Sequence, residues 1–530
     1  MKINRKWLNI LVLASVMALA ACTGGESKEE ANAPKEGKAE ISGDLVLAVQ
    51  SDASTLDPAG SDDVPSHNVQ QAIFEGLIKR DDENNLIPGL AKEWTVVDEL
   101  TYEFTLEEEV TFHDGEAFNA EAVKINLERL IDPEVASSKY NRYEMIADIE
   151  VLDEFKLRVT TEYPFSPILA HLSHSGAGII SPKAIEADYE AIKNGKNPGT
   201  AISENPIGTG HFKFVSWTPG DEVKLVKNDT YWGEQALVDT VTFKIVPESG
   251  TRNADLERGF VQIADPVQPI EVDLLNGSDY AEVIQTPSTG IAFAGFNMDK
   301  APFNDVNVRK AVSMIVDKQA IIDGVYDGFG TIGEGPLAPN VFGYSEDIKG
   351  IEYNVEEAKA LMKEAGHEDG FKATVWTNDS PQRSDTAVYL QSVLKEINIE
   401  LAIEQMEFGT YIENLKSGDH DMYILGWTNP LAEADNGLFS LFHSSTAGVP
   451  PNAMWYGSTT VDELLDKGRE ETDIKERLKL YKQAQEEIVN DAPMIFLSYP
   501  EYLTGVSKKV TGFKIDAGGI YHLDQVQFVE

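Results

Sequence analysis

Regular alternation of strand-like and helix-like segments between residues 371 and 426 constrains the fold of this chain more than any other feature. Strand patterns at 371–377, 399–406 and 422–426 are separated by helix patterns at 384–397 and 411–416. Such alternation is typical of βαβ units, in which helices pack on a mostly parallel sheet. We therefore expect an α/β fold.

Hydrophobic periodicity outside this region predicts further elements. Period-two alternation predicts strands at 94–106 and 155–161, and helical spacing predicts helices at 68–78, 120–130, 308–326 and 355–365, with two more between 461 and 490. Gly366 follows one of these helices at a position where a left-handed residue commonly ends a helix. The chain greatly exceeds the ~250–300 residues at which a single core divides, so at least two domains are expected.

The first 21 residues have the parts of a secretory signal peptide. Lys2, Arg5 and Lys6 give a positive start, residues 7–21 are almost wholly apolar, and small residues precede Cys22. The apolar run is shorter than the ~20 residues that a membrane-spanning helix needs. These features predict a signal peptide over residues 1–21 that is cleaved from the mature protein.

Cys22 is the only cysteine among 530 residues, so it cannot form an internal disulfide. Leu19-Ala20-Ala21-Cys22 resembles a bacterial lipobox, which implies that Cys22 carries a lipid. Residues 22–43 are rich in Gly, Ser, Glu and Lys and predict a flexible tether. We expect a protein held to the outer face of the cytoplasmic membrane, which is the periplasm if the cell is Gram-negative, and in contact with the membrane through this anchor only.

Charge and motif content exclude several classes of function. The net charge of −45 argues against nucleic-acid binding, which relies on clustered Lys and Arg. The glycines at 328, 330 and 333 match a dinucleotide fingerprint but lack the preceding strand, and His171 and His174 lack further metal ligands. We expect no cofactor, no metal and no enzymatic activity, with a lipid-anchored surface hydrolase as the alternative.

Several short blocks occur in a characteristic order along the chain. They are Ile87-Pro88-Gly89-Leu90-Ala91, residues 110–115, residues 205–210, Tyr231-Trp232-Gly233, Val308-Arg309-Lys310-Ala311 and Glu364-Ala365-Gly366. Together they resemble family 5 of the bacterial extracellular solute-binding proteins, which includes dipeptide, oligopeptide, nickel and glutathione receptors. The resemblance spans nearly all of the mature chain.

This resemblance implies a two-lobe clamp of the large periplasmic-binding-protein type, with mixed sheets, closed around a ligand. The chain would cross the hinge twice, near residues 293–297 and near residues 494–502. Lobe one would comprise residues 44–292 plus 497–530, and lobe two residues 293–496. The protein would be a monomer that delivers its ligand to the permease subunits of an ABC importer. Burial of a polar solute between two lobes requires polar groups from both of them.

The segment from Gly426 to Asp435 bears on the ligand. In the dipeptide- and oligopeptide-binding members that it resembles, an aspartate three residues past the tryptophan holds the ligand's ammonium, but this chain has Pro430 there. Glu433-Ala434-Asp435 and Leu441-Phe442 resemble the glutathione-binding branch more closely. Glutathione or a similar short peptide is therefore the expected ligand; a general di- or oligopeptide, or a ligand without an ammonium group, is the alternative.

Six residues are candidates for ligand contact. The resemblance implies that Arg383 holds a ligand carboxylate, which suits a bidentate guanidinium, although it is equally a candidate for a plain surface arginine. Trp427, Thr428 and Asn429 are expected on the cleft wall, with Trp427 either stacked on the ligand or buried as core. Asp435 either takes a ligand ammonium or caps the following helix. Thr55 lies in the first loop, which tends to line the cleft in this family.

Overall fold

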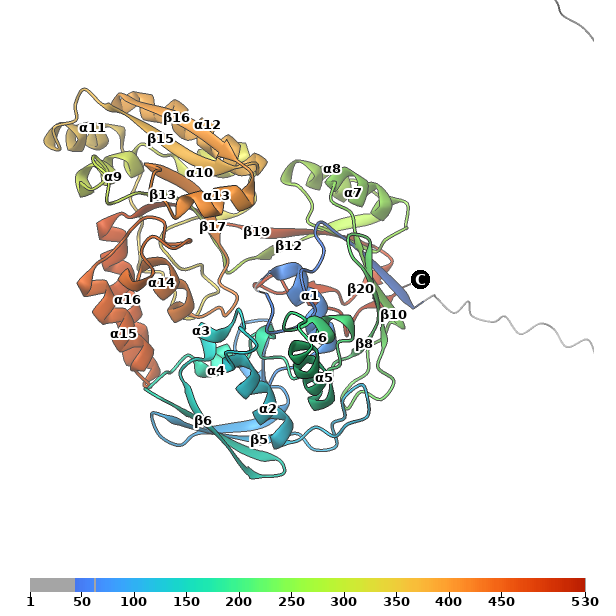
Figure 1. Ribbon diagram of the computed structural model, residues 1–530. Helices are drawn as coiled ribbons and strands as arrows, with labels where there is room; N and C mark the ends of the chain where they lie inside the picture. The colour runs from blue at the N-terminus through green and yellow to red at the C-terminus, as the bar shows by residue number, and fades with distance from the viewer. Residues whose placement is uncertain (1–42, 62, 530) are drawn as a thin grey trace, which may run out of the picture. The chain divides into compact units, whose positions relative to one another are not determined.

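The computed structural model describes residues 43–61 and 63–529 (Figure 1). The predicted signal peptide, Cys22 and all but the last residue of the predicted tether lie outside the described residues. Within the described part of the chain, no helix has the length and apolar character needed to cross a membrane.

A seven-stranded mixed sheet is built from both ends of the chain. Its order is β12 (Ala281–Pro287), β19 (Glu501–Ser507), β11 (Ile263–Asp265), β1 (Asp44–Val49), β10 (Thr240–Ile245), β9 (Glu222–Lys227) and β8 (Phe212–Thr218). The strand β1 runs parallel to β10 and β11. Leu45 and Leu47 pack into the core on one face of β1, and Ala48 packs on the other. Burial on both faces explains the near-continuous apolar sequence of this strand.

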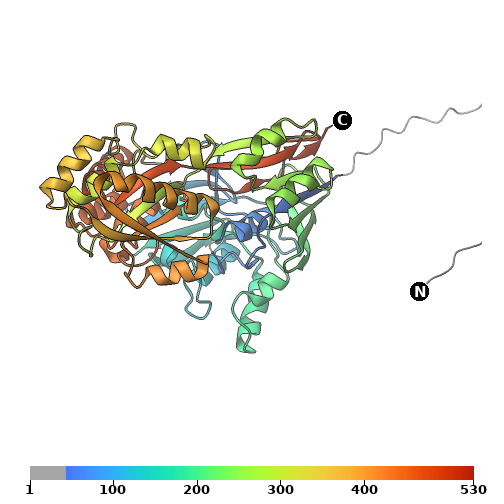
Figure 2. The same ribbon diagram turned by 90° about the horizontal axis from the view of Figure 1, so that it is seen from above.

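A second, six-stranded sheet contains the alternating region. Its order is β14 (Thr331–Ile332), β18 (Met494–Tyr499), β13 (Ile291–Phe296), β17 (Met422–Trp427), β15 (Phe371–Asn378) and β16 (Ile399–Met406). The strand β15 lies parallel to both β16 and β17, with α12 (Pro381–Val393) and α13 (Phe408–Leu415) in the connections. The predicted βαβ units are therefore confirmed. Figure 1 and Figure 2 both show this orange region at the end away from the C-terminus.

A four-stranded antiparallel sheet completes the main framework. Its order is β4 (Ala91–Val96), β5 (Thr101–Leu106), β7 (Lys156–Thr161) and β6 (Ile146–Asp153), and α2 (Ala120–Ile131) packs on it. The prediction of one strand over 94–106 is wrong, because Asp98 accepts a hydrogen bond from the Leu100 N–H and turns the chain there. The two halves keep period-two alternation on either side of that turn, which hides the turn in the pattern.

Helix predictions hold where capping residues agree with the apolar pattern. The helix α11 (Val355–Glu364) is followed by Gly366 at a φ of 76°, as predicted. The helix predicted over 308–326 is instead two helices, α9 (Val306–Met314) and α10 (Lys318–Val325). Asp317 separates them because its backbone is extended and its carboxylate caps α10 by accepting from the Ala320 N–H. The helix predicted over 68–78 begins earlier, as α1 (Val64–Ile73), and its last residue belongs to a strand.

The remaining elements are shorter connections and the helical pair near the end of the chain. They are β2 (Ile78–Arg80), β3 (Leu86–Pro88), α3 (Tyr140–Tyr143), α4 (Ile168–His171), α5 (Pro182–Lys193), α6 (Thr200–Glu204), α7 (Ser249–Glu257), α8 (Val272–Asn276), α14 (Ala434–Phe442), α15 (Thr459–Glu470), α16 (Ile474–Asp491), β20 (Val510–Thr511), β21 (Lys514–Ile515), β22 (Tyr521–His522) and β23 (Gln527–Phe528). The helices α15 and α16 pack on each other and match the two helices expected between 461 and 490.

The chain passes between the two large sheets twice. It leaves β12 of the seven-stranded sheet at Pro287 and enters β13 of the six-stranded sheet at Ile291, and it returns from β18 to β19 through Pro500. These passages fall near the two hinge positions expected from the sequence. The division into lobes at residues 292 and 497 remains a prediction.

Candidate functional site

Two cavities with charged side chains in their lining share the residue Thr428. The first, which we call the Arg383 cavity, has a volume of about 380 Å³ and is lined by residues 266–269, 380, 382–383, 424–428 and 500–503, among others. The second, the Arg80 cavity, has a volume of about 260 Å³ and is lined by residues of α1, β2 and the β21–β22 hairpin together with Thr428 and Pro430. Thr428 lines both cavities, so they adjoin at the end of β17.

Arg383 places an uncompensated cation in the larger cavity. It lies in the first turn of α12, and its Nη1 donates to Asn378 Oδ1 at 3.0 Å. Among residues 43–61 and 63–529, no carboxylate forms an ion pair with it. Burial lowers the pKa of Arg383, and the groups that oppose this effect are the phenols of Tyr411 and Tyr326. A half-buried guanidinium without an acid is suited to an anionic ligand group.

Trp427 and Thr428 both line the Arg383 cavity, and Thr428 also lines the Arg80 cavity. Trp427 ends β17, where it pairs with Ile291, and its indole Nε1 is buried with no hydrogen-bond partner in the described part of the chain. A buried indole N–H normally has an acceptor, so a ligand oxygen would satisfy it. Thr428 approaches the hydroxyl of Tyr502, whose side chain also lines the Arg383 cavity. The structure thus brings three of the six candidates, Arg383, Trp427 and Thr428, to one cavity.

A direct hydrogen bond joins two side chains that line the Arg383 cavity. The side-chain amide of Gln382, in α12, donates to Gln268 Oε1 at 2.8 Å. Gln268 belongs to the segment that follows β11 of the seven-stranded sheet, so this bond joins elements packed on different sheets. It holds the two walls of the cavity together.

The Asn429 side chain forms its hydrogen bonds within the loop after β17. Its side-chain amide donates to the Glu433 backbone oxygen at 2.8 Å and accepts from Asn436 at 3.0 Å, and it is 2% exposed. Its backbone oxygen accepts from Thr289 at 2.8 Å. These bonds fix the loop that carries Thr428 into the cavities. Asn429 itself is not among the residues that line them.

Asp435 is paired with an arginine from α15. Its two carboxylate oxygens accept from Arg469 Nε at 3.0 Å and Nη2 at 3.1 Å, and its side chain is 3% exposed. The helix α14 is capped by Glu433, which accepts from the Asp435 N–H, so the capping role considered for Asp435 belongs to its neighbour. The same guanidinium lies 3.6 Å from the ring centroid of Phe439. Asp435 as a ligand contact remains a prediction.

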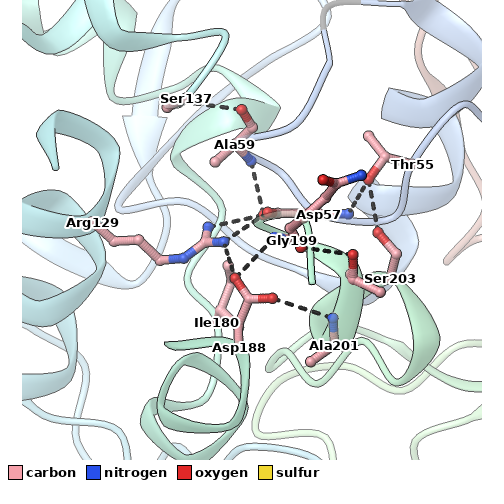
Figure 3. A network of polar contacts seen from close by, with 12 residues as sticks. Thr55, Asp57, Ala59, Arg129, Ser137, Ile180, Asp188, Gly199, Ala201 and Ser203 are labelled. Carbon is pink, nitrogen blue, oxygen red and sulfur yellow. Dashed lines mark hydrogen bonds and ion pairs between the residues drawn. The ribbon is translucent and has the colours of Figure 1, made fainter. Parts of the chain in front are cut away.

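Thr55 belongs to a buried ionic network (Figure 3). Its hydroxyl lies 2.7 Å from the Ser203 hydroxyl and accepts from the Asp57 N–H. Asp57 and Asp188 both bind the guanidinium of Arg129, at 2.7 and 2.9 Å from Nη2. Thr55 does not line the two cavities described above.

Charged residues of the Arg80 cavity were not predicted from the sequence. Arg80, at the end of β2, donates from Nε to Ser173 at 3.1 Å and from Nη1 to the Asn84 backbone oxygen at 2.7 Å. Asp516, in the β21–β22 hairpin, lines the same cavity. Asp516 begins the sequence Asp-Ala-Gly-Gly, which is typical of a turn. This local sequence gives no indication that the Asp516 carboxylate lines a cavity. The contact between segments more than 400 residues apart has no local signal.

In the described part of the chain, no three His, Cys, Asp or Glu side chains are grouped as metal ligands. His171 instead bonds through Nδ1 to the Arg142 backbone oxygen at 2.8 Å. Burial lowers its pKa to about 4, so the ring is neutral at pH 7. It packs edge-to-face against Phe165, 5.1 Å between ring centroids, as a core residue does.

Comparisons with known proteins agree on one family. Residues 85–449 match the model of the bacterial extracellular solute-binding proteins, family 5. The chain is 32% identical over 498 residues to the glutathione-binding protein GsiB of Pectobacterium atrosepticum, across 92% of this chain and 94% of that protein. It is similar in structure to DppA of Helicobacter pylori in complex with the peptide STSA, with 31% identity, a TM-score of 0.79, and coverage of 92% and 98%.

A second solved structure is also similar to this chain. The oligopeptide-binding protein AppA of Bacillus subtilis, in complex with a nonapeptide, has a TM-score of 0.78 and 25% identity, and the match covers 92% of this chain and 99% of that one. The similarity to such binding proteins confirms the predicted two-lobe α/β fold and the expectation of a binding protein rather than an enzyme. The chain belongs to family 5 of the bacterial extracellular solute-binding proteins.

Proposed function

We propose that this protein captures glutathione or a similar short peptide and delivers it to an ABC importer. Arg383 carries this proposal, because it is a half-buried cation without an acid partner among the described residues and it faces the larger cavity. A terminal carboxylate of a peptide supplies the missing anion. The similarity to a glutathione-binding protein supports the choice of ligand, at an identity of 32%.

A general short-peptide receptor is the second candidate. The structural relatives in complex with STSA and with a nonapeptide support it. Both candidates place a ligand carboxylate at Arg383, and they differ in what they require of the other end of the ligand. An ordinary peptide presents an ammonium alone there, whereas glutathione presents an ammonium and a carboxylate on one carbon.

Replacement of Arg383 tests the proposed function. We expect Arg383→Gln to weaken the binding of glutathione about tenfold to a hundredfold, because a charge-assisted bidentate contact is worth ~1.5–3 kcal/mol. Glutathione with an amidated glycine should bind the unaltered protein and the variant about equally weakly. Arg258→Gln is the matched control, since it removes an arginine charge from an exposed position.

Titration calorimetry on the mature chain provides the affinities. The protein is unfolded and refolded first to remove any bound ligand. An unchanged affinity for glutathione in Arg383→Gln would show that the ligand carboxylate binds elsewhere and would remove the observation on which the proposal rests.

The anchoring of the protein follows from the same proposal. Cys22, outside the described residues, carries the lipid, and the protein acts as a monomer at the outer face of the cytoplasmic membrane. The sequence from Leu19 to Cys22 supports this attachment. Cys22→Ser should move the protein from the membrane fraction to the soluble fraction, and mass spectrometry of the wild-type N-terminus should show an acylated cysteine; an unmodified N-terminus would contradict the anchor.

A further inference from the structure

We propose that the Arg80 cavity is a second ligand subsite that binds a zwitterionic amino-acid head group, with Asp516 accepting from its ammonium and Arg80 donating to its carboxylate. This inference rests on the proposed function, because it concerns the other end of the ligand whose carboxylate meets Arg383. It identifies the ligand class as γ-glutamyl peptides, which carry such a head group.

Arg80 is held in place by hydrogen bonds from two of its guanidinium nitrogens, and the third nitrogen can still donate to a ligand. Its Nε and Nη1 are fixed by Ser173 and by the backbone of Asn84, while Nη2 makes no hydrogen bond within residues 43–61 and 63–529. No carboxylate of the described residues forms an ion pair with it. Burial lowers the pKa of Arg80, and the charges of Glu433 and Asp516 partly oppose this effect. Glu433 is already bound to Arg477 at 2.9 Å, so it does not neutralise Arg80.

Asp516 supplies the opposite charge in the same cavity. Its Oδ1 accepts from the N–H groups of Gly518 and Ile520, both at 2.9 Å, which fixes the carboxylate on the hairpin. Its Oδ2 is 3.4 Å from His522 Nε2, a long contact, and the side chain remains 29% exposed. Oδ2 is therefore available to a further donor.

Together the two side chains make a complementary charge pair. Asp516 lies close enough for its charge to act on Arg80, yet the two do not form an ion pair with each other. A free amino-acid head presents both an ammonium and a carboxylate on one carbon, so its recognition requires an acid and a base side by side. The N-terminus of an ordinary peptide has only the ammonium, and it would leave Arg80 without a partner in a half-buried site.

The two cavities share one lining residue, Thr428. In the proposed arrangement the ligand lies across this residue, with one end at Arg383 and the other at the Arg80–Asp516 pair. Glutathione has a matching charge pattern, with a zwitterionic γ-glutamyl head and a glycine carboxylate at the far end. Pro430, which also lines the Arg80 cavity, adds no charge to it.

Single-group analogues of glutathione test each contact. Glutaryl-Cys-Gly lacks only the ammonium, and 4-aminobutanoyl-Cys-Gly lacks only the head carboxylate. Asp516→Asn keeps the oxygen that holds the hairpin but removes the charge, and Arg80→Gln removes the guanidinium. Asp82→Asn and Lys514→Gln are matched controls, because these residues form an exposed ion pair nearby and do not line the cavity.

Titration calorimetry of the mature chain should give a specific pattern. Asp516→Asn should weaken the binding of glutathione about tenfold or more and leave the affinity for glutaryl-Cys-Gly unchanged. Arg80→Gln should weaken the binding of glutathione to the same extent and leave the affinity for 4-aminobutanoyl-Cys-Gly unchanged. The two control variants should bind all three ligands as the wild type does. Far-ultraviolet circular dichroism and urea unfolding identify any variant that fails to fold, and the analogue series on the wild-type protein then still tests the subsite.

The outcomes separate this subsite from the proposed function. If the wild type binds glutathione and both analogues equally, the subsite is refuted while the glutathione receptor stands. If it binds ordinary short peptides but not glutathione, the γ-glutamyl subsite is refuted and the general peptide receptor stands. If it binds neither, both the subsite and the proposed function are refuted.

Discussion

Removal of the Arg129 guanidinium should destabilise the fold strongly, because it leaves two buried carboxylates without a cation. Arg129 is 2% exposed and donates to both oxygens of Asp57, at 3.0 and 2.7 Å, and to Asp188 at 2.9 Å. The carboxylates are also nearly inaccessible, at 2% and 1%. Loss of one partner from a buried ionic cluster costs about 3–5 kcal/mol, so we expect that loss for Arg129→Met.

An exposed arginine with the same kind of partners provides the control. Arg158 donates to Glu103 at 2.7 Å and to Glu150 at 2.9 Å, but its side chain is 36% exposed. Water solvates the carboxylates that remain in Arg158→Met, so that variant should lose far less stability than Arg129→Met. The two variants differ in burial and not in the number of acidic partners.

Urea unfolding followed by circular dichroism gives the free energy of unfolding for each variant. Arg129→Met should lower the free energy of unfolding far more than Arg158→Met does, because only its carboxylates stay out of contact with water. Equal losses in the two variants would contradict the importance assigned to burial of this cluster.

Two further predictions concern other buried carboxylates. Burial raises the pKa of Asp265 despite hydrogen bonds from Thr504 and Tyr521, so the wild type loses stability as the pH rises through the raised pKa. The free energy of unfolding of Asp265→Asn, measured with urea, should therefore compare better with that of the wild type at pH 7 than at pH 4. The opposite order would contradict this prediction. Asp435→Asn should lower the free energy of unfolding by about 2–3 kcal/mol, since the partly buried Arg469 loses its charged acceptor, and an unchanged unfolding midpoint would show that the pair is not stabilising.

Local patterns in the sequence predicted much of the fold. The βαβ region and the α15–α16 pair are confirmed because each strand or helix there has a clear period and defined ends. The errors occur where a turn or cap falls inside a continuous apolar pattern, as at Asp98 and Asp317. A single polar residue redirects the backbone in both places without breaking the surrounding periodicity.

The candidate site could be predicted only in part. Arg383, at the start of α12, and Trp427 and Thr428, at the end of β17, were expected from the family resemblance, and the structure brings them to one cavity. Thr55 and Asn429 are instead held by hydrogen bonds within loops. Arg80 and Asp516 could not be predicted because they come from opposite ends of the chain and share a cavity only in the folded protein.

Titration of glutathione into the refolded, ligand-free mature chain is the decisive experiment for the proposed receptor. We expect one-to-one binding at micromolar affinity or tighter, with the glutathione recovered unchanged. An absence of binding heat at several temperatures, for glutathione and for a panel of short peptides alike, would contradict it.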